Sequence, residues 1–87
     1  MKFETLEQIN KLIVKEKEQA SYYITLDNED KTKEVVFYLD CTLEDAREVF
    51  SYVIKEQQKV YRESNYKIKW RVVRLFNSNN ELLAQES

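Results

Sequence analysis

The sequence has no glycine, no proline and no histidine, and it has a single cysteine, Cys41. At average usage, a chain of this length would carry roughly six glycines and four prolines. Without glycine, the phosphate-binding loops of nucleotide enzymes are excluded, because those loops need positive φ angles and close backbone approach. Without histidine, no Ser-His-Asp or Cys-His relay can form. These absences predict a protein that is not an enzyme, with no catalytic residues and no cofactor.

The lone cysteine and the acidic segments do not form a recognisable metal site. One cysteine cannot close an intramolecular disulfide, and it cannot complete a zinc site without histidine partners. We expect Cys41 to be a small buried side chain at the end of a strand; the alternative is a reactive thiol or an intermolecular link. The segment DNED at 27–30 lacks the spacing, the glycine and the later glutamate of a calcium loop, so we interpret it as a polar turn.

The chain length of 87 residues predicts a single domain over 1–87 with one hydrophobic core. No segment approaches the ~18 consecutive apolar residues of a membrane span. The N-terminal segment MKFETLEQIN is too polar for a signal peptide. Together with the free thiol, these features predict a soluble cytoplasmic protein that does not contact membranes.

Charge is distributed unevenly along the chain. Residues 1–48 hold seven Lys/Arg against twelve Asp/Glu, which gives −5, whereas residues 49–87 hold seven against four, which gives +3. Such asymmetry is typical of a surface that binds polyanions, but it also suits two oppositely charged surfaces that attract each other or a partner.

Two segments show helical periodicity, and each follows a threonine that can cap a helix. The phrases TLEQ and TLED place Thr5 and Thr42 three residues before a glutamine or an aspartate, as in a capping box. Apolar residues recur at helical spacing after both. We therefore predict helices at about 5–18 and 42–63.

Elsewhere the apolar pattern alternates with a period of two, which is typical of strands. We predict strands at 21–27, 34–41 and about 66–76, with the tail at 81–87 forming either a short fourth strand, which we favour, or a frayed helix. The loop DNEDKTK and the turn NSNN use Asp and Asn in place of glycine. The predicted fold class is α+β, in the order α-β-β-α-β-(β). Its antiparallel sheet of three to four strands has the order 2-1-3-4, with both helices on one face.

Aromatic and basic side chains are predicted to share the sheet face that turns away from the helices. Alternation places on this face Tyr23, Thr25, Val36, Tyr38, Lys67, Lys69, Arg71 and Val73. The opposite set of the third strand, Ile68, Trp70 and Val72, is expected to face the helices. Arg74 breaks the alternation: either a bulge at Val72–Val73 returns it to the basic face, or it extends from the rim of the core.

Two functions fit this face, and the candidate binding surface is the same for both: Tyr23, Tyr38, Lys67, Lys69 and Arg71. The first hypothesis is a small non-enzymatic protein that binds a protein partner or a second copy of itself, since exposed Tyr and Arg are enriched at interfaces. The alternative is weak binding of single-stranded nucleic acid, with bases stacked on the aromatic rings and Lys and Arg along the phosphates. The acidic pI of about 5.2 and the nearby Asp27, Asp40 and Glu34 weigh against the alternative.

Overall fold

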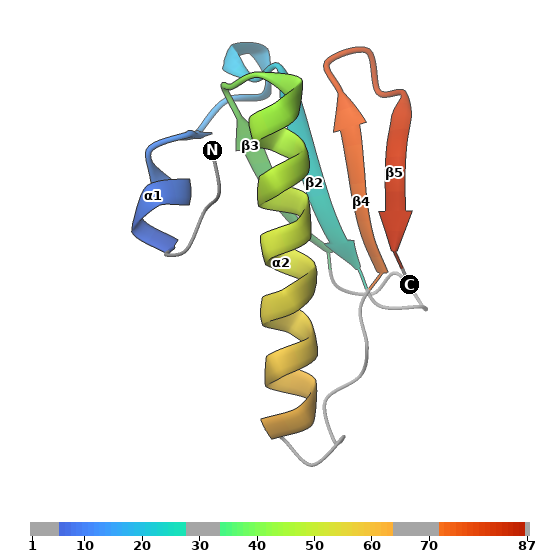
Figure 1. The fold of residues 1–87 in the computed structure, drawn as a ribbon. Coiled ribbons are helices and arrows are strands. Elements are labelled where there is room, and N and C mark those ends of the chain that lie inside the picture. The colour runs from blue at the N-terminus through green and yellow to red at the C-terminus, as the bar shows by residue number, and fades with distance from the viewer. Residues whose placement is uncertain (1–5, 28–33, 64–71, 87) are drawn as a thin grey trace.

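A computed structural model describes residues 6–27, 34–63 and 72–86. These residues form a mixed α+β fold with one main helix packed on a sheet (Figure 1). The sheet is antiparallel and has five strands. The elements are α1 (Leu6–Asn10), β1 (Ile13–Val14), the 3₁₀ helix η1 (Lys17–Gln19), β2 (Tyr22–Asp27), β3 (Glu34–Leu39), α2 (Leu43–Glu63), β4 (Val72–Asn77) and β5 (Leu82–Glu86).

The sheet order is β1-β3-β2-β4-β5, and all neighbours are antiparallel. The predicted antiparallel α+β class is thus confirmed, but the strand count and order differ from the prediction because β1 is added at the β3 edge. The four strands that we predicted keep the neighbours we assigned to them. The tail forms strand β5, as favoured over a frayed helix.

The predicted helix at 5–18 is wrong beyond Asn10. The backbone N–H of Leu12 donates to the Ile9 carbonyl at 2.9 Å and ends the helical run. Ile13 and Val14 then pair with Leu39 and Tyr38 of β3. Lys- and Glu-rich composition favours a helix here, but the β-branched pair and an open strand edge outweigh that intrinsic preference.

The main helix α2 matches the predicted helix at 42–63 and covers one face of the sheet, packing on β2 and β4 (Figure 1). Its first turn is capped by Thr42, whose Oγ1 accepts from the Asp45 N–H at 3.2 Å. Ala46 and Val49 are buried against the sheet. The C-terminal turns extend past the strands (Figure 1), which explains why Val60, a member of the predicted apolar stripe, is 46% exposed.

A small core lies between α2 and the sheet. Its largest fully buried side chains are Ile24, Leu39, Val49, Val73 and Leu75. Ile9 of α1 belongs to the same core. Strands β2, β3 and β4 each contribute to it, so the core fixes which sheet face turns inward.

The phase of β4 differs from the predicted alternation. Val73, predicted to face away from the helices, is fully buried, and Val72 is paired with Asp27 on the other face. Of the two alternatives left open for Arg74, the structure shows the one that places it on the face away from α2 with Leu75 in the core. The β2–β4 pairing runs without a shift over 72–77, so this pairing contains no bulge at Val72–Val73. The physical reason is that Val73 and Leu75 fill the core while the charged Arg74 between them turns outward. Ile68 and Trp70 lie outside the described residues.

The turn between β4 and β5 is built from asparagine, as predicted. Asn77 Oδ1 accepts from the N–H groups of Asn79 at 2.9 Å and Glu81 at 3.0 Å. Asn80 has a φ of 64°, in the left-handed region that asparagine tolerates better than most residues. The predicted polar loop at 27–33 lies outside the described residues except for Asp27.

Candidate interaction face of the sheet

The sheet face opposite α2, here called the outer face, carries every second residue of the strands. The pairing registers place on it Val14, Tyr23, Thr25, Asp27, Glu34, Val36, Tyr38, Val72, Arg74, Phe76, Leu82 and Gln85. Helix α2 packs on the other side of β2 and β4. Among the described residues, the main helix α2 therefore leaves this face uncovered.

Three aromatic side chains form a row across β3, β2 and β4. Tyr23 lies directly opposite both Tyr38 and Phe76 in the strand registers. The Tyr23 and Phe76 rings stack with centroids 4.8 Å apart and an angle of 13°, and the Tyr23 and Tyr38 rings are tilted at 6.2 Å. Such pairs stabilise adjacent strands and also present a continuous aromatic surface. We call Tyr38, Tyr23 and Phe76 the aromatic row.

The central ring of the aromatic row is held by polar contacts. Tyr23 donates its hydroxyl hydrogen to Asn80 Oδ1 at 2.7 Å, and Lys17 Nζ donates to the same oxygen at 2.8 Å. The Lys17 ammonium also lies 5.3 Å from the centroid of the Tyr23 ring, a cation–π distance. Partial burial, followed by the nearby Tyr38 and Glu34, raises the pKa of Tyr23 above its ordinary value.

An ion pair lies beside the aromatic row. Arg74 Nη1 contacts both carboxylate oxygens of Asp27 at 2.8 Å, and Arg74 Nε donates to Gln85 Oε1 at 3.0 Å. Asp27 is only 5% exposed, although it lies on the outer face. Its burial is compatible with a charge because the guanidinium pairs with it.

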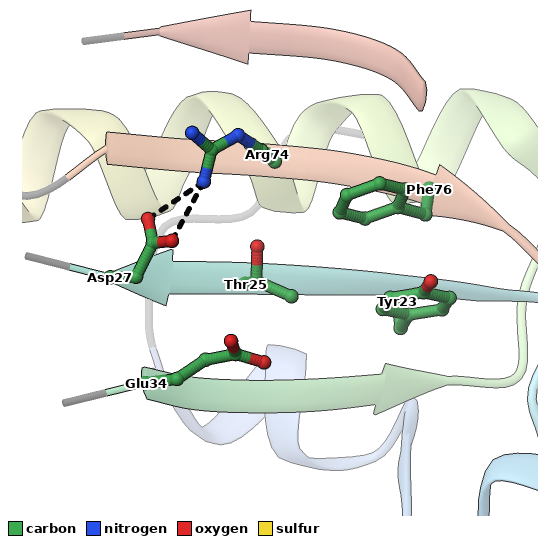
Figure 2. A pocket seen from close by; sticks show the side chains of 6 residues that line it. All are labelled: Tyr23, Thr25, Asp27, Glu34, Arg74 and Phe76. Carbon is green, nitrogen blue, oxygen red and sulfur yellow. Dashed lines mark hydrogen bonds and ion pairs between the residues drawn. The ribbon is translucent and has the colours of Figure 1, made fainter. Parts of the chain in front are cut away.

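A pocket of about 320 Å³ opens between the ion pair and the aromatic row. Its lining residues are Tyr23, Thr25, Asp27, Glu34, Arg74 and Phe76 (Figure 2). Figure 2 shows the Glu34 side chain on β3 directed toward Thr25, across the pocket from Arg74. The described part of the chain provides no hydrogen bond or ion pair to the Glu34 carboxylate.

The structure brings together only part of the predicted surface. Tyr23 and Tyr38 lie side by side on the outer face, and Arg74 joins them there. Lys67, Lys69 and Arg71 lie outside the described residues, so their place on this face stays a prediction. Phe76 was not predicted on this face, because an alternation that starts from Lys67 assigns it to the core side. Only the β2–β4 register shows that Phe76 lies directly opposite Tyr23.

The single cysteine, Cys41, lies half-buried in the connection between β3 and α2. Burial, with smaller contributions from Asp45 and Asp40, raises its pKa to about 11. A thiol with so high a pKa is a poor nucleophile at neutral pH. Within the described residues, no group of His, Cys, Asp and Glu is arranged to hold a metal ion.

Among the described helices, none combines the length and the apolarity that a membrane span requires. Comparison of the chain with protein-family models, with curated proteins and with solved structures finds no significant match.

Proposed function

We propose that this protein is a non-enzymatic binding module that contacts another protein chain, either a partner or a second copy, through the outer face of its sheet. The observation that carries the proposal is the aromatic row, Tyr38–Tyr23–Phe76, on a sheet face opposite the main helix. Aromatic residues are enriched at protein interfaces because they bury a large area with few rotatable bonds. We place this activity in the cytoplasm, where a lone free thiol persists.

Two features support a protein ligand for this face. The stack on Phe76 and the hydrogen bond to Asn80 fix the Tyr23 ring before any partner arrives, which reduces the entropy lost on binding. Apolar surface continues from the row onto β5, where Leu82 lies opposite Phe76 and is 52% exposed. An exposed leucine beside a fixed aromatic row is the kind of surface that a protein partner buries.

The electrostatics of the described face do not favour nucleic acid. Arg74 is engaged by Asp27 and Gln85, so its charge is already compensated. Glu34 adds a carboxylate that repels phosphate. Single-stranded nucleic acid is therefore the less favoured ligand, and titration with an oligonucleotide tests it.

The proposal is tested with a matched pair of leucine substitutions. Leu82→Ser alters β5 beside the aromatic row, whereas Leu43→Ser alters an exposed leucine (37%) at the start of α2. Light scattering from micromolar to millimolar concentration measures self-association, and affinity capture followed by titration of the captured protein measures partner binding. We expect Leu82→Ser to weaken whichever association occurs and Leu43→Ser to leave it unchanged.

The proposal fails if the wild-type protein is monomeric at the highest concentration and captures no protein. It also fails if both leucine variants associate as well as the wild type. Circular dichroism of both variants verifies that the fold is retained, because exposed positions tolerate such changes within ~0.5 kcal/mol in most cases.

A further inference from the structure

Among the described residues, the charges that line the pocket on the outer face sum to a net negative charge. Among its lining residues, Asp27 and Glu34 are acidic and only Arg74 is basic. The Arg74 guanidinium is bound to the Asp27 carboxylate, and its Nε is bound to Gln85. Glu34 is therefore the lining charge that has no counter-ion within the described part of the chain.

The other wall of the pocket is aromatic. Tyr23 and Phe76 line it with their stacked rings. Aromatic faces attract cations, and this attraction already operates at Tyr23, where the Lys17 ammonium lies 5.3 Å from the ring centroid. A carboxylate that faces an aromatic wall is the chemistry that recognises an ammonium or a guanidinium group.

We infer that this pocket receives a lysine or arginine side chain of the protein that contacts the outer face. The apolar stem of such a side chain lies against the aromatic rings, and its charged end pairs with Glu34. The Thr25 hydroxyl, between Glu34 and Arg74, is a further acceptor in the pocket (Figure 2). Since the cation belongs to the partner, this inference rests on the proposed function.

The size of the pocket agrees with a single side chain as its occupant. Its volume of about 320 Å³ is at the lower limit of small-molecule sites, which span roughly 300–1,000 Å³. A phosphate group in the pocket would be repelled by the carboxylate of Glu34. The one basic side chain among the described lining residues, Arg74, is already paired with Asp27. The charge of the lining residues therefore favours a basic side chain over a nucleotide, and the volume is sufficient for such a side chain.

The test is a titration of the isotopically labelled protein with a hexa-arginine peptide at low salt, followed by NMR. We expect amide signals of residues around the pocket to shift, and Glu34→Gln to weaken the affinity by roughly threefold or more, since exposed ion pairs and cation–π contacts contribute ~0.5–1 kcal/mol each. Phe76→Leu should weaken it as well. Glu56→Gln, which removes the same charge from an exposed position of α2, should leave it unchanged.

The inference is overturned if Glu34→Gln and Glu56→Gln weaken binding equally, because the peptide would then respond only to overall charge. It is also overturned if a single-stranded oligonucleotide, titrated in place of the peptide, shifts the pocket signals and binds more tightly to Glu34→Gln. These failures are distinct from failure of the proposed function. If Leu82→Ser abolishes association while Glu34→Gln leaves peptide binding intact, the outer face is an interface and the cation site is refuted.

Discussion

Arg74 donates from a single guanidinium nitrogen to both carboxylate oxygens of Asp27, at 2.8 Å to each. The two residues are diagonal neighbours on adjacent strands, because Asp27 lies opposite Val72 and Arg74 lies opposite Thr25. The Asp27 side chain is 7% exposed and the Arg74 side chain 24%. Together with the burial of Val73 and Leu75 in the core, this pair fixes the phase of β4, and it forms one wall of the pocket.

Replacing the buried carboxylate should destabilise the fold. Asp27→Asn keeps the shape but leaves the guanidinium without its counter-ion, and we expect the free energy of unfolding to fall by about 1–3 kcal/mol. Gln85→Ala, which removes the exposed partner of the same arginine, should cost no more than ~0.5 kcal/mol. Urea denaturation of the two variants measures both values. An Asp27→Asn protein as stable as the wild type would show that the pair does not hold β4 in phase.

The face assignment itself is tested by two leucines on neighbouring strands. Leu75 is fully buried, whereas Leu82 is 52% exposed. Leu75→Ala should therefore lower stability by about 2–5 kcal/mol, because it leaves a cavity in a small core. Leu82→Ala should change stability by ~0.5 kcal/mol or less. Thermal melts of the two variants measure this difference. Equal melting temperatures would contradict the assigned faces, and a lower melting temperature for Leu82→Ala would mean that the faces are inverted.

Local sequence signals were sufficient to predict the elements that have a long apolar pattern or characteristic capping and turn residues. The capping threonine and the apolar stripe predicted α2, and the asparagine-rich turn predicted the hairpin of β4 and β5. Strict alternation in 22–27 assigned Tyr23 and Thr25 to one face and Ile24 to the other. Each of these signals depends only on residues close in the sequence.

The rest depends on contacts between distant residues. Strand β1 forms because Ile13 and Val14 pair with the edge strand β3. Intrinsic helix propensity contains no information about such pairing with a distant strand. Two adjacent valines leave the phase of β4 ambiguous, and Arg74 resolves it only through Asp27, which lies 47 positions away. The pocket was missed for the same reason, since its lining comes from three strands.

The pKa of Cys41, raised to about 11 from an ordinary value of 9.0, predicts that its thiol reacts slowly with alkylating reagents. At pH 8 the thiolate population is reduced roughly 100-fold, while the greater nucleophilicity of a more basic thiolate recovers roughly 10-fold, so alkylation should be about 10-fold slower than in the unfolded chain. Iodoacetamide labelling with and without urea measures this ratio. Equal rates in the two conditions would contradict the assigned burial.

The same shift predicts a loss of stability at alkaline pH. Between pH 9.0 and about 11 the unfolded chain releases the thiol proton while the folded chain retains it, so this contribution to stability falls as the pH rises through that range. Below it, both states hold the proton and the contribution is constant. Urea denaturation of the wild type and of Cys41→Ser across this range should show a weaker pH dependence in the variant.

The central claim, that the outer face binds another protein chain, is tested most directly by site-specific photo-crosslinking in cells. A photoreactive amino acid is placed at Tyr38 on β3 or Leu82 on β5, both on the outer face, and at Leu43 or Val60, which are exposed on α2. We predict a discrete crosslinked product, a dimer or a complex with one partner, from positions 38 and 82 and none from 43 and 60. Crosslinks confined to the helix positions, or no crosslink from any of the four, would contradict the claim.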